Sequence, residues 1–242
     1  MSLYLVRLPF DAPMLLRFAR EHGIGADDET LGYLLHAWLK ALFGEHAPKP
    51  FRYREQRHRN TDAIVAAPRD VLAYSALSHD ALLEHARLFA SPLAWAALDE
   101  AGVASKCMPK EWRAGQRLRM EVLACPVSRK DDEEKDIYLR VLEREGDSAP
   151  SRAEVYRRWF QSQWHGSVSF ESIEMVGMVA RSRLLRRARN DGNRLRVVER
   201  PQATFLAQAV IENPMRFVSL LARGIGRHRA FGFGMVLLAP PA

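Results

Sequence analysis

Residues 199–240 read ERPQATFLAQAVIENPMRFVSLLARGIGRHRAFGFGMVLLAP, and this stretch decides the fold. It predicts the end of a strand, followed by a helix that Pro214 opens and that runs through Ala222. The glycines over 224–234 predict a loop, and FGMVLL at 233–238 predicts a final strand. A strand, a helix and a strand in this order predict part of an α+β unit.

The residues before this stretch extend the same unit. Residues 171–189 and 194–212 predict a long hairpin, because NDGN at 190–193 is a turn sequence. SRAEVYRRWFQSQW at 151–164 predicts a helix with Ser151 as its N-cap. The second half of the chain therefore reads α-β-β-α-β. SRKDDEEKD at 128–136 has no apolar face, so we interpret it as a solvated loop near the domain boundary.

The first half predicts a similar unit. Asp27 or Asp28 can cap its first helix, and Glu29 favours the helix dipole. Its predicted elements, in β-α-β-β-α-β order, are strands over 3–8, 50–55, 62–67 and 116–125 and helices over 28–43 and 79–90. We therefore predict fold class α+β, with two tandem ferredoxin-like (RRM-like) βαββαβ domains at residues 1–127 and 128–242.

The charge is concentrated in one segment. The chain has 242 residues and a formal net charge of +7, which indicates either a polyanionic partner or an arginine-rich surface. Residues 181–200 (RSRLLRRARNDGNRLRVVER) hold eight arginines against one aspartate and one glutamate. As a hairpin, this segment would neutralise phosphates along an RNA stem. A basic helix over 178–189 that binds a protein or a membrane is the alternative, but the turn and the alternating RLRVV favour the hairpin.

Two further observations bear on the compartment. Cys107 and Cys125 lie in no metal-like spacing, which favours a reduced, cytoplasmic chain. The sequence has no apolar run of the about 18 residues that a membrane span needs, so no membrane partner is expected.

The helix predicted over 28–43 carries the first candidate site. At about 100° per residue, its leucines and Trp38 form one apolar stripe, and Tyr33, His36 and Lys40 fall on nearly the opposite side. Imidazole can take or give a proton near neutral pH, a phenol can orient its neighbours, and an ammonium can stabilise charge on phosphoryl oxygens. These groups suit RNA cleavage by the ribose 2′-hydroxyl, which leaves a 2′,3′-cyclic phosphate and a 5′-hydroxyl. An ordinary solvated helix face is the alternative that the residues alone leave open.

The glycine-rich loop carries the second candidate site. Glycines let the backbone turn sharply and bring its N–H groups close to a phosphate. Arg227, His228 and Arg229 add charge at that point. A dinucleotide-binding role is disfavoured, because no βαβ unit can follow the loop. A packing role for Gly232 and Gly234 beside the last strand stays open.

Three stretches resemble one family. Residues 199–240 resemble the C-terminus of the CRISPR repeat-processing endoribonucleases of the CasE kind, in the repeat-associated RNA-binding superfamily. That family ends in a loop of the form G-I-G-basic-x-basic-A-F-G-x-G and a last strand. YLLHAWLKALFG at 33–44 resembles the family's Tyr-x-x-His helix, whose histidine serves in catalysis. RLRMEVLACPVSRK at 117–130 resembles a further stretch, with Cys125 where the family often has asparagine, and 131–136 reads as an insertion.

The resemblance implies a metal-independent endoribonuclease that cleaves the stem-loop of CRISPR repeat RNA. It also implies that the protein stays bound to the 3′ hairpin of the crRNA and joins an effector complex of type I-E or type IV-A. No cofactor and no metal are expected. The catalytic candidates are Tyr33, His36 and Lys40. The RNA-binding candidates are Arg181, Arg183, Arg186, Arg187, Arg189, Arg227, His228 and Arg229, with Gly224, Gly226, Gly232 and Gly234 in the loop.

Two other functions stay open at this point. A non-catalytic RNA-binding subunit of the same superfamily also carries a glycine-rich loop, but it needs no Tyr33–His36 pair. A cleaving relative could depend on arginine instead, and Arg17 and Arg20 precede the helix.

Overall fold

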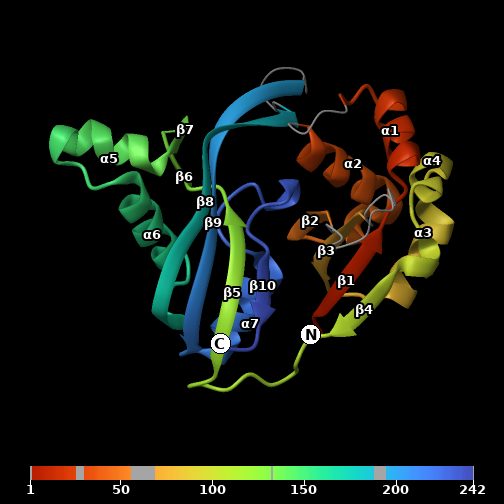
Figure 1. The fold of residues 1–242 in the computed structure, drawn as a ribbon. Helices are drawn as coiled ribbons and strands as arrows, with labels where there is room; N and C mark the ends of the chain where they lie inside the picture. The colour runs from red at the N-terminus through yellow and green to blue at the C-terminus, as the bar shows by residue number, and fades with distance from the viewer. Residues whose placement is uncertain (1, 26–29, 56–68, 132, 188–194, 242) are drawn as a thin grey trace, which may run out of the picture. The chain divides into compact units, whose positions relative to one another are not determined.

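The computed structural model describes residues 2–25, 30–55, 69–131, 133–187 and 195–241 (Figure 1). The chain divides into two compact units, one of residues 1–108 with 230–232 and one of residues 109–229 with 233–242. This division differs from the predicted boundary at residues 127 and 128, because the strand over 117–124 pairs with strands of the second unit.

The first unit is an antiparallel sheet with helices in the connections. Its sheet has the order β2-β3-β1-β4, which is the ferredoxin-like arrangement predicted from the sequence. The elements are β1 (Tyr4–Pro9), α1 (Ala12–Glu21), α2 (Leu31–Phe43), β2 (Phe51–Glu55), β3 (Arg69–Ser75), α3 (His79–Phe89), α4 (Pro92–Ala96) and β4 (Ala104–Cys107).

Helix α2 packs through the stripe that its sequence predicts. The buried side chains on this stripe are Leu34, Leu35, Trp38, Leu39 and Leu42. Trp38 also donates its indole N–H to the carbonyl oxygen of Ala94, at 3.0 Å. A buried indole needs such a partner, so this bond ties α2 to α4.

Two details of the first unit differ from the prediction. The N-cap of α2 is Thr30, and Asp27, Asp28 and Glu29 lie outside the described residues, as does the strand predicted over 62–67. The strand that pairs with both β1 and β2 is instead β3, which the sequence analysis did not predict. All of β3 after its first residue is buried, so it lacks the alternation that marks a half-buried strand.

The second unit repeats the arrangement. Its sheet has the order β10-β5-β9-β8, again antiparallel and again ferredoxin-like. The elements are β5 (Arg117–Ala124), β6 (Val127–Lys130), β7 (Glu133–Asp136), α5 (Ile137–Glu145), α6 (Arg152–Ser162), β8 (Val168–Arg187), β9 (Leu195–Ile211), α7 (Pro214–Arg223) and β10 (Val236–Ala239).

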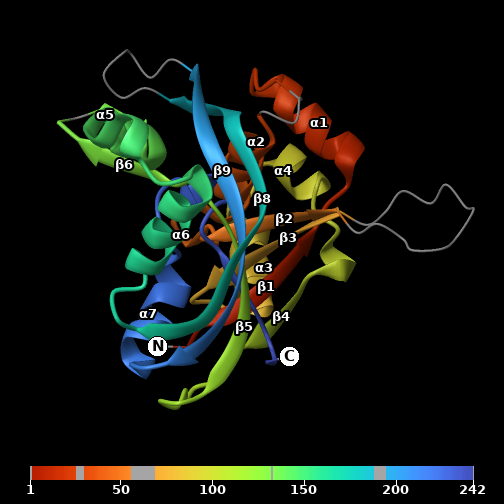
Figure 2. The ribbon, with the colours of Figure 1, turned by 60° about the vertical axis from the view of Figure 1, so that its left-hand side comes forward.

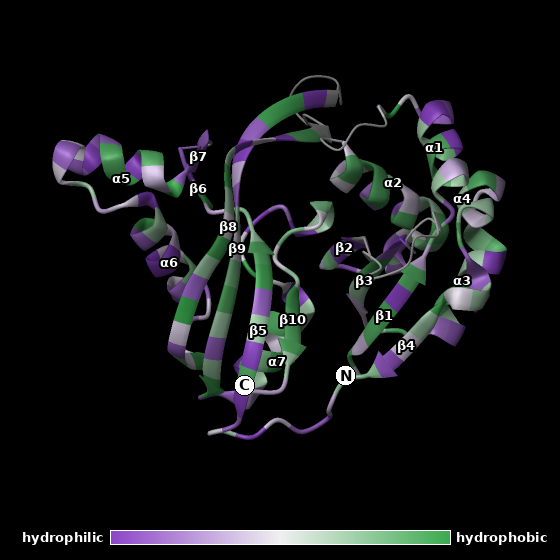
Figure 3. Ribbon diagram, viewed as in Figure 1, coloured by the Kyte–Doolittle hydropathy of each residue, from purple (hydrophilic) through white to green (hydrophobic). Residues whose placement is uncertain are grey.

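The long predicted hairpin is confirmed. Strands β8 and β9 pair from Val168↔Ile211 to Arg187↔Leu195, and Figure 2 shows them side by side. The predicted NDGN turn lies outside the described residues. Apolar and polar residues alternate along β5 in Figure 3, and its alternate side chains are buried. Helix α6 packs on this sheet through Phe160, whose ring stacks on Phe205 at 4.4 Å between centroids.

The segment at 128–136 is not a solvated loop, and that prediction is wrong. Residues 127–130 and 133–136 form the antiparallel hairpin β6–β7. The segment has no apolar pattern because its buried side chains include the carboxylates of Glu134 and Asp136, which pair with cations. Separately, none of the helices in the described part of the chain is long and apolar enough to cross a membrane.

Candidate functional site

The predicted catalytic helix and part of the glycine-rich loop meet within the first unit. Residues 230–232 belong to that unit, although they lie almost 200 positions after α2 in the sequence. The rings of His36 and Phe231 pack edge to face, with 5.4 Å between their centroids. The Tyr33 ring lies nearly parallel to Phe231, at 6.3 Å and 23°. Two of the stretches that carry the sequence resemblance therefore form one site.

Gly32 is the residue that permits this approach. A Cβ atom at position 32 would lie 2.5 Å from the backbone oxygen of Phe231. Real side chains essentially never come that close to a backbone atom. A helix interior ordinarily disfavours glycine by about 1 kcal/mol, so close packing explains its presence in α2.

The face of α2 that carries Tyr33 and His36 is not open to solvent. Tyr33 is only 8 % exposed, whereas His36 is half-buried and Lys40 is exposed. Helical periodicity placed all three on the side nearly opposite the apolar stripe, a face that the core does not need. Burial of Tyr33 contradicts that prediction, because periodicity cannot show that a distant segment covers the helix. Only the ring contacts with Phe231 reveal it.

His36 opens into a small pocket of about 90 Å³. This is well below the roughly 300–1,000 Å³ of pockets that enclose a whole small ligand, so it suits a phosphoryl group at the edge of a larger molecule. The lining residues are His36, Leu39, Lys40, Glu45, Ala47, Pro48, Lys49, Phe51 and Ala230. Lys40 also donates from Nζ to the backbone oxygen of Gly44 at 2.8 Å, which satisfies a carbonyl at the end of α2.

The pocket is electropositive around the imidazole. Burial lowers the pKa of His36, and the ammonium groups of Lys40 and Lys49 lower it further. This lowered pKa favours the neutral ring, which can accept a proton. Lys49 was not predicted, because it lies in the connection after α2, where no periodicity indicates its direction.

Backbone contacts in the second unit fix the base of the glycine-rich loop. Gly234 has a φ of +73°, and a Cβ atom there would lie 2.0 Å from the backbone oxygen of Ile225. Ile225 N–H donates to Gly234 O at 2.8 Å, and Gly234 N–H donates to Leu123 O at 2.7 Å. A packing role for Gly234 is thus confirmed. Gly224, Gly226 and Gly232 also have positive φ.

The predicted cations of the loop have different surroundings. Arg229 donates from Nη1 to Arg223 O at 2.9 Å. Burial lowers the pKa of Arg229, and Arg223 and Arg227 lower it further. The His228 side chain is only 7 % exposed and lies against Glu134, so its ring does not present a surface for RNA.

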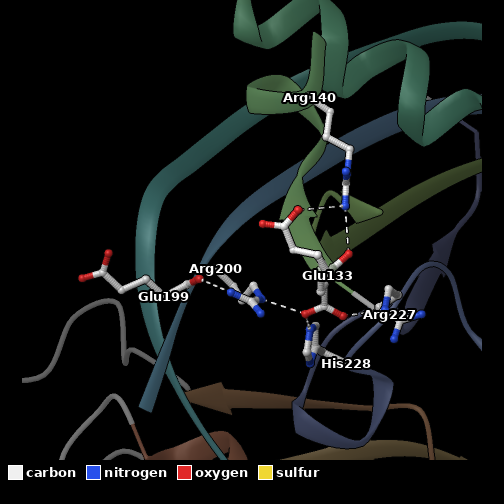
Figure 4. A network of polar contacts seen from close by, with 7 residues as sticks. Glu133, Arg140, Glu199, Arg200, Arg227 and His228 are labelled. Carbon is white, nitrogen blue, oxygen red and sulfur yellow. Dashed lines mark hydrogen bonds and ion pairs between the residues drawn. The ribbon is translucent and has the colours of Figure 1, made fainter. Parts of the chain in front are cut away.

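Glu134 is the centre of a charged cluster that the sequence analysis missed. Its carboxylate pairs with Arg200, Arg227 and His228, and Figure 4 shows these three side chains close together. Burial raises the pKa of Glu134, but hydrogen bonds from His228, Arg200 and Arg227 outweigh it and hold the pKa far below its usual range. In the sequence, the signal that could have indicated this cluster was an acidic residue in a strongly basic half of the chain.

The arginines of the hairpin lie along β8 or beyond it. Arg181 and Arg183 are exposed, and the buried Leu184 and Leu185 follow them. Arg181 lies 3.9 Å from Glu199 on the paired strand, a long ion pair between exposed side chains. For the remaining candidates only the backbone is described, with Arg186 and Arg187 in β8, and Arg189 lies outside the described residues.

Comparison with known proteins identifies the family. A family model described as CRISPR associated protein matches residues 3–240. None of the curated proteins matches the chain. The fold is similar to CRISPR endoribonuclease Cse3 bound to 19 nt RNA, with a TM-score of 0.62 at 16% identity over 99% of this chain and 100% of that one. It is also similar to Thermus thermophilus Cse3 bound to an RNA representing a pre-cleavage complex, with a TM-score of 0.62 at 15% identity over 99% and 100%.

A third similar structure is the CRISPR-associated protein Cas6e from Escherichia coli str. K-12, with a TM-score of 0.58 at 16% identity over 98% of this chain and 100% of that one. At these identities the likeness concerns the fold. The family match covers nearly the whole chain and agrees with the resemblance seen in the sequence. This protein therefore belongs to the family of CRISPR-associated proteins.

Proposed function

We propose that this protein is an endoribonuclease that cleaves the stem-loop of CRISPR repeat RNA and so produces mature crRNA. The observation that carries the proposal is the meeting of His36 with Phe231 at a pocket that also contains Lys40 and Lys49. The fold it shares with an RNA-bound CRISPR endoribonuclease supports it. A structure described as a CRISPR RNA-guided surveillance complex, at a TM-score of 0.53, supports retention of the protein in an effector complex.

The residues around the pocket suit cleavage without a metal ion. The neutral imidazole of His36 takes the proton of a ribose 2′-hydroxyl, and the 2′-oxygen attacks the adjacent phosphorus. The bond to the 5′-oxygen breaks, and that oxygen takes a proton from the imidazolium or from water. The products are a 2′,3′-cyclic phosphate and a 5′-hydroxyl. Lys40 and Lys49 supply positive charge for the phosphoryl oxygens as their negative charge grows.

Tyr33 acts as a positioning residue in this proposal. Its buried ring lies against Phe231, and Phe231 in turn contacts the His36 ring. The three rings hold one another, so the imidazole keeps its orientation while RNA binds. The RNA itself is bound by the hairpin arginines, Arg181, Arg183, Arg186, Arg187 and Arg189, and by Arg227 and Arg229 of the loop.

The test uses a labelled CRISPR repeat hairpin in the presence of EDTA. The parent protein is expected to cut the all-ribose hairpin at one bond and to leave a hairpin with deoxyribose 5′ of that bond intact. His36→Ala is expected to bind the hairpin but not to cut it. His46→Ala is the matched control, because its ring lies against His85 in the same unit and outside the pocket lining.

Each outcome has a distinct meaning. Loss of cutting by the parent in EDTA, with recovery on adding a divalent cation, contradicts the metal-independent mechanism. Undiminished cutting by His36→Ala removes His36 from the reaction. Binding without cutting by the parent favours a non-catalytic RNA-binding subunit.

A further inference from the structure

The β6–β7 hairpin directs its charged side chains to two opposite sides. Successive side chains of a strand alternate between faces. Glu133 lies 3.9 Å from Arg140 of α5, and Lys135 pairs with Glu143 of the same helix. Glu134, between them, pairs instead with Arg227 and His228 of the glycine-rich loop. Of these two glutamates, Glu134 therefore contacts the predicted RNA-binding cations Arg227 and His228, and Glu133 contacts Arg140.

The carboxylate of Glu134 is saturated with donors. Oε1 accepts from Arg200 Nε and from His228 Nε2, both at 2.7 Å. Oε2 accepts from Arg227 Nε at 2.6 Å. The Glu134 side chain is only 6 % exposed. Charge-assisted bonds of this length fix the orientation of their donors.

Glu134 orients Arg227 without cancelling the local charge. One carboxylate faces two guanidinium groups, so a net positive charge remains in the cluster. Arg227 uses Nε for the carboxylate, and 43 % of its side chain stays exposed. The Nη1–Nη2 edge of a guanidinium can bind a phosphate through two parallel bonds, and the bond from Arg227 to Glu134 uses Nε instead of that edge.

The base of the loop is held by contacts that do not involve Glu134. Ile225, Gly234 and Leu123 hold the base of the loop by main-chain bonds. A Cβ atom at Gly226 would lie 3.1 Å from the Trp159 ring, so the backbone packs closely there as well. Removing the Glu134 charge should therefore free the Arg227 and His228 side chains while the loop keeps its path.

We propose that Glu134 is a positioning residue for RNA binding, which holds Arg227 so that its outer guanidinium edge contacts a phosphate of the repeat RNA. This inference rests on the proposed function, because it presumes that the chain binds repeat RNA. It predicts that removing the Glu134 charge weakens RNA binding, whereas the change in net charge alone would strengthen it. Removing a glutamate raises a formal net charge that is already +7, which by itself strengthens binding to a polyanion.

The experiment measures the dissociation constant of a labelled repeat hairpin against salt concentration. It compares the parent with Glu134→Gln, Glu133→Gln, Arg227→Gln and the double variant Glu134→Gln/Arg227→Gln. Glu133→Gln is the matched control, since it removes the same charge from the neighbouring residue. We expect Glu134→Gln to weaken binding about tenfold, as one lost phosphate contact would, and to lower the slope of log affinity against log salt by about 1.

The other variants complete the test. Arg227→Gln should match Glu134→Gln, and the double variant should be no weaker than either, because both changes remove one contact. Glu133→Gln should bind as tightly as the parent or more tightly. Single-turnover cleavage at saturating protein should stay within about threefold of the parent for Glu133→Gln. For Glu134→Gln the loss of affinity should exceed the loss of that rate, a split between affinity and rate that misfolding does not give.

Two results overturn the inference while leaving the proposed function intact. One is a Glu134→Gln protein that cuts the repeat and binds it at least as tightly as the parent. The other is unchanged affinity in Arg227→Gln, which decides the matter even where Glu134→Gln does not fold. Failure of the parent itself to bind the hairpin overturns the proposed function and this inference together.

Discussion

His36 and His228 have opposite surroundings. His36 lies against the ring of Phe231 and near the ammonium groups of Lys40 and Lys49. His228 lies against a buried carboxylate that two arginines also contact. The first arrangement favours a neutral ring beside a site for an anion. The second arrangement satisfies the ring with a fixed partner.

This difference distinguishes a histidine that can take part in the reaction from one that has a structural role. A proton acceptor needs a ring that can exchange its proton during the reaction, and no described carboxylate bond ties His36. A structural ring needs a partner that holds it, especially at His228, where φ is +59° and the backbone is uncommon for a side chain. The sequence alone marks both histidines as candidates, and only their neighbours distinguish them.

The largest expected effect comes from making the same substitution at both rings. His36→Ala should lower single-turnover cleavage by about 10²–10⁴-fold, which is the usual contribution of a general base. His228→Ala should lower it by no more than about threefold at saturating protein, because its ring touches Glu134 and not the reacting atoms. Quenched-flow or gel assays of both variants check this. Comparable losses at the two positions would break the distinction.

The contact between α2 and residues 230–232 gives the next largest effect. In an ordinary helix interior, Gly32→Ala would stabilise the protein by up to about 1 kcal/mol. Here the new Cβ would lie 2.5 Å from Phe231 O, so we expect a net loss of about 1–3 kcal/mol from overpacking. Cleavage should fall as well, because Phe231 contacts His36. Chemical denaturation decides the sign, and a stabilised variant would contradict the described packing.

Much of the fold was predictable from local patterns. The apolar stripe of α2, the β8–β9 hairpin and the final helix and strand each follow from a period or a turn sequence. Strand β3 was missed because burial on both faces leaves it without a period. The fold class was predictable because both halves repeat one order of elements.

The site was only partly predictable. His36 follows from the helix and the family resemblance. Burial of Tyr33 and the ion pairs of Glu134 depend on segments that are distant in the sequence. Lys49 lies in the connection after α2, where no periodicity indicates its direction. An acidic residue in a charged segment is ordinarily solvated, and only the convergence of Arg200, Arg227 and His228 makes its burial favourable.

The stability of the second unit should report the Glu134 cluster. A carboxyl group whose pKa is lowered by folding contributes stability above its ordinary pKa of about 4.3 and loses it as the pH falls toward the folded value. At pH 7 the parent should exceed Glu134→Gln in unfolding free energy by about 1–3 kcal/mol, and this difference should shrink on acidification. Glu133→Gln, measured by the same urea titrations, is the control, because its exposed side chain lies outside the cluster. A difference that is constant with pH would contradict the cluster.

The smallest expected effect concerns the lysines at the pocket. Because the pKa of free His36 is lowered, kcat/KM should rise with pH through a value below the ordinary 6.5 and level off above it. Lys49→Met should move this rise of kcat/KM toward higher pH, because the variant lacks one of the positive charges that lower the pKa of His36. Lys110→Met is a control outside the pocket lining. An unchanged pH dependence of kcat/KM in Lys49→Met would show that Lys49 does not influence the pKa of His36.

Chemical rescue of His36→Ala is the most direct test of the claim that the ring at position 36 transfers the proton. The variant is mixed with labelled repeat hairpin in EDTA, and single-turnover cleavage is measured as free imidazole is added. We expect cutting at the parent's bond to recover by at least about tenfold, in proportion to the neutral imidazole present, with no stimulation of the parent. Normal hairpin binding without any recovery, or full cutting before imidazole is added, would contradict the account.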